Sequence, residues 1–293
     1  MPPPTLTKRL TLAAAPAVLL GAMTAACTPL GLFATLSPKD PSAVAVRGAA
    51  YGPHPRQRLD VYAPRGARGS APVAVFFYGG SWDSGRRQDY NWVGRALAAK
   101  GFLAVVADYR IYPDVTYPAF LEDGALAVRW AADNAAAYGG DPGRIVLAGH
   151  SAGAYNAVML GLDRRWLAAA GVDPSTVRAV AGLAGPYDFL PIASPITERI
   201  FGATPDLPAT QPAAHVRSDA PPAFLATGDD DEMVWPRNTS RLAAKLRDAG
   251  ATVEERHYPG VDHIRIILAL SRPLRGRAPV LEEMTAFLRR HAS

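Results

Sequence analysis

The stretch G-H-S-A-G at residues 149–153 decides the fold of this chain. It follows an apolar run at 144–148, which predicts a short buried strand, and precedes residues 154–160, which predict a helix. A serine between two glycines at such a turn matches the G-x-S-x-G pattern, in which a strand turns sharply into a helix. Glycine is needed on both sides because the backbones approach too closely for side chains. The turn is expected to hold the Ser151 hydroxyl at the edge of the sheet, where a base and a substrate can reach it.

Strands and helices alternate along the rest of the chain. Apolar runs predict buried strands, and apolar residues at three- and four-residue spacing predict helices. The expected strands are 58–62, at an edge of the sheet, 72–78, 102–107, 177–183, 223–226 and 252–258, and the expected helices are 90–100, 118–138, 241–249 and 280–291. This alternation predicts an α/β fold, in which helices cover both faces of a mainly parallel central sheet. Residues 186–220, rich in proline and alanine, interrupt the alternation and predict a small lid over the functional edge.

Length and composition are those of a globular protein with one large core. The chain has 293 residues, of which 49% are hydrophobic, and a formal net charge of +5. Its basic residues are spread along the sequence rather than clustered, so a nucleic-acid partner is not supported.

The first 26 residues differ from the rest. Lys8 and Arg9 precede an uncharged, mostly apolar stretch that ends at Ala26, which is the pattern of a secretory signal peptide. The stretch is short and is interrupted by Pro16 and Gly21, so it is a poor candidate for a membrane span. We therefore expect an exported protein.

Cys27 is the only cysteine in the chain, so no intramolecular disulfide is expected. The sequence T-A-A-C at 24–27 resembles a bacterial lipoprotein signal, in which the cysteine is lipidated, although Thr24 stands where leucine is usual. That resemblance implies a lipid-anchored protein of a bacterial cell envelope. The alternatives are ordinary cleavage near Ala26, which would give a periplasmic or secreted protein, and an uncleaved anchor. Residues 27–50 lack strong periodicity and predict a tether to a domain at 51–293.

The serine needs a base, because a hydroxyl is a weak nucleophile until its proton is removed. In folds with this turn, the acid and then the base follow the serine along the chain. His263 lies in a loop after the last expected strand, at the edge of the sheet, and is the predicted base. The other histidines are less suitable. His54 lies before the expected sheet, and His150 lies inside the turn and is expected to face away from Ser151. The remaining ones lie in the insertion (His215), in a strand (His257) and in the last helix (His291).

The acid is expected after the strand that ends at residue 226. Four carboxylates follow it at 229–232, and one of them should accept a hydrogen bond from the ring of the base and stabilise its imidazolium. Asp231 is favoured. Asp229, Asp230 and Glu232 stay as alternatives because spacing alone does not distinguish them.

Acyl transfer also requires N–H groups that stabilise the negative charge on the substrate oxygen. The residue after the serine, Ala152, supplies one, and the loop after the third strand supplies others. That loop reads G-G-S-W at 79–82, and the backbone N–H groups of Gly80 and Ser81 are the candidates. The alternative is a plain glycine turn.

Together these motifs resemble the α/β-hydrolase fold. Within it the chain is similar to the esterase branch related to hormone-sensitive lipase and arylformamidase, which includes bacterial carboxylesterases and feruloyl or acetyl-sugar esterases. The similarity extends to segments at 57–62, 108–110, 117–119, 185–188 and 228–234. The last of these matches G-x-x-D-x-x-V and supports Asp231 over its neighbours. Asp108 and Arg110 are then expected to be structural, and Tyr78 stands where the family usually has a histidine that helps to fix the oxyanion loop.

The resemblance implies a serine hydrolase that cleaves small, short-chain acyl or aryl carboxylic esters without a metal or organic cofactor. Trp82, Tyr112 and the segment 186–220 are expected to shape the substrate pocket. The alternatives are an amidase, arylformamidase or peptidase with the same three residues and, less favoured, a non-catalytic surface lipoprotein.

Overall fold

The computed structural model describes Met1, residues 28–66 and residues 70–292. The expected signal peptide after Met1 and the expected lipidation site Cys27 lie outside these residues. Among the helices within the described ranges, none is both long enough and apolar enough to cross a membrane.

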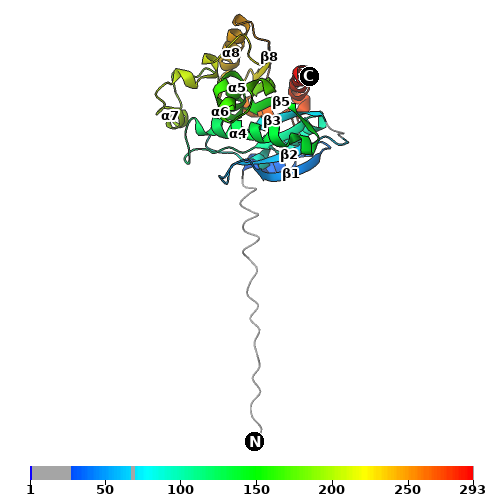
Figure 1. Cartoon of the computed structure of the whole chain (residues 1–293). Helices are drawn as coiled ribbons and strands as arrows, with labels where there is room; N and C mark the ends of the chain where they lie inside the picture. The colour runs from blue at the N-terminus through cyan, green and yellow to red at the C-terminus, as the bar shows by residue number, and fades with distance from the viewer. Residues whose placement is uncertain (2–27, 67–69, 293) are drawn as a thin grey trace.

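An eight-stranded sheet forms the centre of the molecule, in the order β1-β2-β4-β3-β5-β6-β7-β8 (Figure 1). β1 and β2 are antiparallel to their neighbours, and the pairs from β4 to β8 are parallel, which confirms the expected mainly parallel sheet. The strands are β1 (Ala43–Ala50), β2 (Arg58–Ala63), β3 (Ala71–Phe77), β4 (Leu103–Ala107), β5 (Gly140–His150), β6 (Val177–Leu183), β7 (Ala223–Gly228) and β8 (Val253–Tyr258).

The helices follow the strands much as the spacing predicts. They are α2 (Pro29–Leu36), α3 (Asn91–Ala99), α4 (Ala119–Asn134), α5 (Ala152–Leu162), α6 (Arg164–Ala169), α7 (Pro195–Phe201), α8 (Arg237–Asp248), α9 (His263–Leu268) and α10 (Val280–His291). Short 3₁₀ turns are η2 (Arg87–Tyr90), η3 (Ala135–Tyr138), η4 (Pro174–Thr176), η5 (Pro208–Thr210), η6 (Pro212–Ala214) and η7 (Arg275–Arg277).

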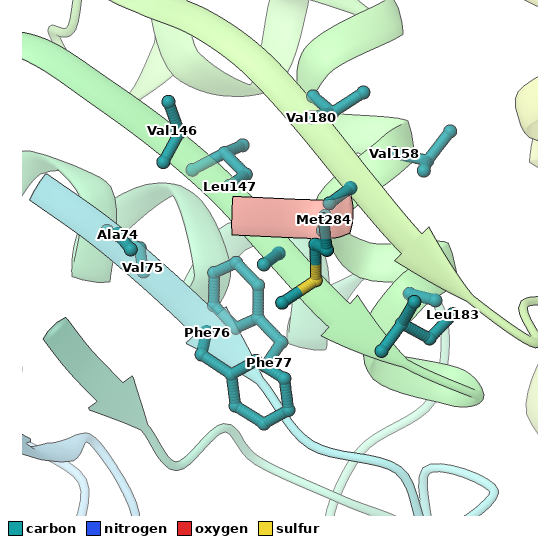
Figure 2. Packing of buried hydrophobic residues seen from close by; sticks show 14 of the residues in the cluster. Ala74, Val75, Phe76, Phe77, Val146, Leu147, Val158, Val180, Leu183 and Met284 are labelled. Atoms are coloured by element: carbon teal, nitrogen blue, oxygen red, sulfur yellow. The ribbon is translucent and has the colours of Figure 1, made fainter. Parts of the chain in front are cut away.

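The central strands are apolar on both faces because both faces are covered. Neighbouring residues of a strand point to opposite faces, and on β3 Phe77 lies beside Gly124 of α4, whereas Phe76 packs against Tyr90 with ring centroids 6.1 Å apart. Figure 2 shows side chains of β3, β5 and β6 packed with Val158 of α5 and Met284 of α10.

The expected tether at 27–50 is wrong over its described part. Residues 29–36 form α2, which begins where the Thr28 hydroxyl accepts a hydrogen bond from the Gly31 N–H at 2.9 Å. Residues 43–50 form β1, which pairs with β2. β2 is therefore an inner strand rather than the expected edge strand. The sequence did not predict β1 because its polar and apolar residues do not alternate regularly. This agrees with its pairing to β2, which shifts register twice.

The segment 186–220 contains α7, η5 and η6 between irregular stretches. Phe201 of α7 is fully buried, and the Tyr155 hydroxyl of α5 donates a hydrogen bond to the Thr210 carbonyl at 2.5 Å. The segment is thus packed onto the helix that follows Ser151. Its role as a lid stays a prediction.

Candidate active site

Ser151 lies in the strained turn between β5 and α5. Its backbone has φ 55° and ψ −124°, a conformation that side-chain-bearing residues rarely adopt. A Cβ on Gly149 would lie 2.1 Å from the Gly153 carbonyl oxygen, and a Cβ on Gly153 would lie 2.1 Å from the Phe77 carbonyl oxygen. The two glycines are therefore required by close backbone contact, as the pattern predicts.

A row of hydrogen bonds joins the three side chains expected to carry the chemistry. The Ser151 Oγ lies 2.8 Å from His263 Nε2, and His263 Nδ1 lies 2.7 Å from Asp231 Oδ2. All three residues are at least nine-tenths buried. They come from the ends of β5, β7 and β8, which the parallel sheet brings to one edge. Such a row can move a proton from a hydroxyl to an imidazole and stabilise the resulting charge.

The backbone around Asp231 explains why this carboxylate, and not its neighbours, faces His263. Its Oδ1 accepts hydrogen bonds from the N–H groups of Met233 at 3.0 Å and Val234 at 2.8 Å, which leaves Oδ2 for the imidazole. Asp229 faces His257 instead, at 3.1 Å. Asp230 and Glu232 are exposed.

His263 is the first residue of α9 rather than part of a loop. The Asp262 side chain caps this helix by accepting from the N–H groups of Ile264 at 3.0 Å and Arg265 at 2.7 Å. The cap fixes the start of the helix and hence the backbone that carries His263.

His150 also contacts His263, which the sequence did not reveal. The two ring centroids are 4.8 Å apart, and His150 Nε2 lies 2.9 Å from the His263 carbonyl oxygen. A carbonyl only accepts, so Nε2 carries the proton. His150 therefore holds the backbone of His263. Its expected orientation away from Ser151 stays a prediction. Burial and the neighbouring His263 charge lower the pKa of His150 to about 3.

The buried His150 should make stability depend on pH. Its pKa in the folded protein lies below the unfolded value of about 6.5, so the unfolded chain binds more protons below pH ~6.5. The free energy of unfolding therefore falls as the pH drops from 6.5 toward 3. The variant His150→Gln keeps a side-chain N–H but does not titrate. Between pH 7 and pH 5 its free energy of unfolding should fall by about 2 kcal/mol less than that of the parent. Urea unfolding at both pH values measures the difference, and equal losses in the two proteins would contradict it. The exposed His257→Gln is the control.

The loop that carries two of the expected oxyanion donors lies beside Ser151. A Cβ on Gly79 would come within 2.9 Å of the Ser151 Cβ, so the loop after β3 abuts the serine. Gly80 and Ser81 have φ of 134° and 49°, an unusual backbone that turns this loop back on itself. In the part of the chain that the structure describes, their N–H groups donate to no backbone carbonyl. Ala152 begins α5, so its N–H has no partner within the helix.

Asn156 connects the two halves of this donor group. Its Oδ1 accepts a hydrogen bond from Trp82 Nε1 at 3.0 Å, which ties the loop after β3 to the helix that begins at Ala152. Asn156 is fully buried, and Trp82 is 4% exposed. The ring of Trp82 packs on Phe120 and edge-on against Phe201, with centroids 5.6 and 5.0 Å away. No pattern in the sequence marks Asn156.

Trp82 was expected to contact substrate, but its burial leaves only a small edge for such contact. Its indole points into the core and ties the loop that carries it to α5. Tyr112, the other expected pocket residue, is half-buried beside it, and its N–H donates to the Trp82 carbonyl at 2.8 Å. Contact of either residue with substrate stays a prediction.

Loss of the indole N–H should impair the reaction more than it impairs binding. In Trp82→Phe, the loop and α5 lose their hydrogen bond, and small displacements of oxyanion donors are costly in the transition state. We expect kcat for a p-nitrophenyl ester to fall by about ten- to a hundredfold with little change in KM. Trp130→Phe, at a half-buried indole stacked on Tyr138, is the matched control. A Trp82→Phe enzyme with the parent kcat would disprove the role.

Tyr78 lies beneath the loop and not at the oxyanion position. Its ring is stacked between Tyr90 and Tyr109, with centroids 5.2 and 4.9 Å away, and its hydroxyl donates to Asp108 Oδ1 at 2.8 Å. Burial raises the pKa of the Tyr78 phenol well above its usual value. Asp108 also pairs with Arg87 at 2.5 Å. Tyrosine thus anchors the loop through the core, and Asp108 occupies a structural position.

Arg110 is likewise structural. Its guanidinium pairs with the fully buried Asp123 at 2.8 Å, and its N–H donates to the same carboxylate at 2.7 Å. This pair joins the end of β4 to α4 and does not reach Ser151.

The chain is similar in sequence to several esterases. Carboxylesterase NlhH of Mycobacterium tuberculosis is 33% identical over 242 residues, which cover 74% of each chain. Isoprenylcysteine alpha-carbonyl methylesterase ICME of Arabidopsis thaliana is 30% identical over 251 residues, which cover 78% of this chain and 58% of the relative. The chain spans about 60% of the length of the plant relatives that it matches.

Solved structures agree on the fold. Esterase B from Lactobacillus rhamnosis superposes with a TM-score of 0.79 at 18% identity, over 94% of each chain. The esterase of Pyrobaculum calidifontis superposes with a TM-score of 0.73 at 24% identity, over 90% of this chain and 89% of its own. At the level of sequence, residues 59–246 match the BD-FAE family. The match covers more than half of the chain, which therefore belongs to the BD-FAE family of the α/β-hydrolase superfamily.

Proposed function

We propose that the protein is a carboxylic ester hydrolase of the serine type. The observation that carries this proposal is the row of hydrogen bonds from Asp231 through His263 to Ser151. A second support is that, among the described residues, the N–H groups of Gly80 and Ser81 donate to no backbone carbonyl. The names of the relatives, carboxylesterase and methylesterase among them, support ester cleavage.

Acylation begins when the Ser151 oxygen attacks the ester carbonyl carbon. His263 Nε2 takes the hydroxyl proton, while Asp231 holds the ring and stabilises the imidazolium. The electron pair of the carbonyl moves to its oxygen, and the N–H groups of Gly80, Ser81 and Ala152 bind that oxygen. When the carbonyl re-forms, the bond to the alkoxy oxygen breaks, and the imidazolium gives its proton to the leaving alcohol.

Deacylation repeats the route with water. His263 removes a proton from the water as its oxygen attacks the acyl carbon, and the oxyanion again lies on the same donors. Collapse breaks the bond to Ser151, which recovers its proton from the imidazolium. The carboxylic acid is then released. The two steps together consume one water molecule and return Ser151 and His263 to their starting protonation states.

The substrate class that we propose is small, short-chain acyl or aryl esters. The packing of segment 186–220 onto α5 through Phe201 and Thr210 supports this size, because a segment held there would limit the room for a long acyl chain. Initial rates on p-nitrophenyl esters of increasing acyl length test it, and a maximum at long chains would contradict it.

A fluorophosphonate probe tests the nucleophile, because it labels an activated serine covalently. The chain offers an internal control in Ser240 of α8, whose Oγ lies 3.2 Å from His257 Nε2, while His257 Nδ1 lies 3.1 Å from Asp229 Oδ1. That second set is exposed, and Ser240 sits within a helix whose N–H groups are already bonded. Peptide mass spectrometry should find the label on Ser151 alone. Label on Ser240, or on any other residue, would overturn the assignment.

We also propose, from the sequence, that the protein is exported and lipidated at Cys27. The observation that supports this is the apolar segment that ends in T-A-A-C at 24–27. The mass of the mature protein from a bacterial membrane tests it, and a mature chain with an unmodified cysteine would contradict it.

A further inference from the structure

A cavity of about 650 Å³ lies on the β1 side of the sheet. It is lined by the end of α2 and the residues after it, by Arg47 of β1, by the start of α3, by Arg65 just after β2 and by Arg272 after α9. Figure 1 shows β1 and β2 side by side at one edge of the molecule. β1 is four strands away from β5, or roughly 19 Å at the usual strand spacing, so the cavity is separate from the turn that carries Ser151. Five cations line the cavity, and we call this set the basic pocket: Lys39, Arg47, Arg65, Arg95 and Arg272.

Little negative charge balances the basic pocket. Of the described residues that line it, only Asp40 is a carboxylate, and its two oxygens are bound by Arg275 at 3.0 and 2.8 Å. Burial and the charge of Arg95 lower the pKa of Lys39, as expected where cations are crowded. The cations are far apart in the sequence, between residues 39 and 272, which is why no basic cluster was visible there.

An apolar surface adjoins these cations. Ala34 and Thr35 of α2 line the basic pocket, and on the same helix Leu32 and Leu36 are 50% and 72% exposed. Residues four apart share one face of a helix, so the two leucines project together into solvent. α2 itself carries no charge, and the cations beside its leucines come from other elements. Exposed apolar side chains next to basic ones are the two features that bind a protein surface to an anionic membrane interface.

We propose that the basic pocket binds the phosphate of an anionic phospholipid headgroup, with Leu32 and Leu36 inserted among the neighbouring acyl chains. Guanidinium groups match the oxygens of a phosphate in geometry and charge. A soluble phosphate would use the cations but would leave the leucines without a partner. The lipid surface satisfies both observations, and it does so independently of the ester-cleaving site.

Partition of the full chain into lipid vesicles tests the proposal. Vesicles of phosphatidylcholine alone are compared with vesicles that also contain phosphatidylglycerol, and bound protein is measured by sedimentation. The parent and every variant share the N-terminal segment with Lys8 and Arg9, so its contribution cancels when they are compared on the same vesicles. Each basic residue at an anionic surface contributes about fivefold to partition, so Arg47→Gln/Arg65→Gln should lower binding to the anionic vesicles by about thirtyfold. Binding to the neutral vesicles should change little.

Two further variants separate the causes. Arg129→Gln/Arg247→Gln removes the same charge from exposed positions on α4 and α8, and it should bind anionic vesicles nearly as the parent does. Leu32→Ser/Leu36→Ser should bind both kinds of vesicle more weakly. All variants are expected to keep the parent esterase activity and unfolding temperature, because the substituted side chains are exposed.

Four results would overturn the proposal. They are the absence of any preference for anionic vesicles, an equal loss in the pocket variant and the charge control, unchanged binding of the leucine variant, and saturable binding of inorganic phosphate in dialysis that leaves vesicle partition unaltered. The last of these would assign the basic pocket to a soluble anion.

Discussion

Replacing Ser151 with alanine should lower kcat for a p-nitrophenyl ester by about 10⁴- to 10⁶-fold. The reason is that no other hydroxyl lies within hydrogen-bond distance of His263 Nε2 in the part of the chain that the structure describes. KM and the unfolding temperature should change little, because alanine fits the turn as well as serine does. Steady-state kinetics at high enzyme concentration measure the residual rate.

The control for this substitution is Ser240→Ala. Ser240 also bonds a histidine, at 3.2 Å, but it lies inside α8, where its own N–H group is bonded to the Pro236 carbonyl, so its loss should leave kcat unchanged. A Ser151→Ala protein that keeps more than about a tenth of the parent kcat would show that another group attacks the ester.

Asp231→Asn should be the next most damaging single change, with kcat lower by about 10⁴-fold. The carboxylate accepts the Nδ1 proton of His263, whereas an amide can present its NH₂ group there and favour the wrong tautomer. The N–H groups of Met233 and Val234 already hold Oδ1, so they would orient an asparagine with its oxygen toward the backbone and its nitrogen toward the ring. The fold should survive, since the substitution keeps size and shape. Rates on the same ester check this expectation.

Asp229→Asn and Asp230→Asn are the matched controls, because both carboxylates are exposed neighbours of Asp231. They should stay close to the parent rate. If either lowered kcat as much as Asp231→Asn does, the assignment of the acid would be wrong.

Much of the fold and of the site could be predicted because each depends on local patterns. Apolar runs bounded by turns predicted the inner strands, and the glycines around Ser151 predicted the sharp turn that the structure contains. The positions of Asp231 and His263 followed from chain order, since parallel strands bring their carboxyl ends to one edge. Spacing placed both residues after strands, but it left the choice among four adjacent carboxylates to the resemblance with known esterases.

The rest depends on contacts between distant parts of the chain. His150 supports His263, and Asn156 bonds Trp82, because of side-chain directions that no spacing rule supplies. β1 was missed because its pairing with β2, and not its own periodicity, makes it a strand. The basic pocket was missed because its cations converge only after folding.

The irregular pairing of β1 has a consequence for solubility. A sheet that ends in a straight, apolar strand offers its free N–H and C=O groups to other molecules, and so invites aggregation. β1 ends this sheet with two breaks in register and the exposed Arg47, both of which discourage such pairing. A shortened protein that began at Tyr51 would lack β1 and its protection of the sheet edge. Its β2, with Leu59 and Val61, would become an exposed edge strand to which another molecule could add a strand of its own.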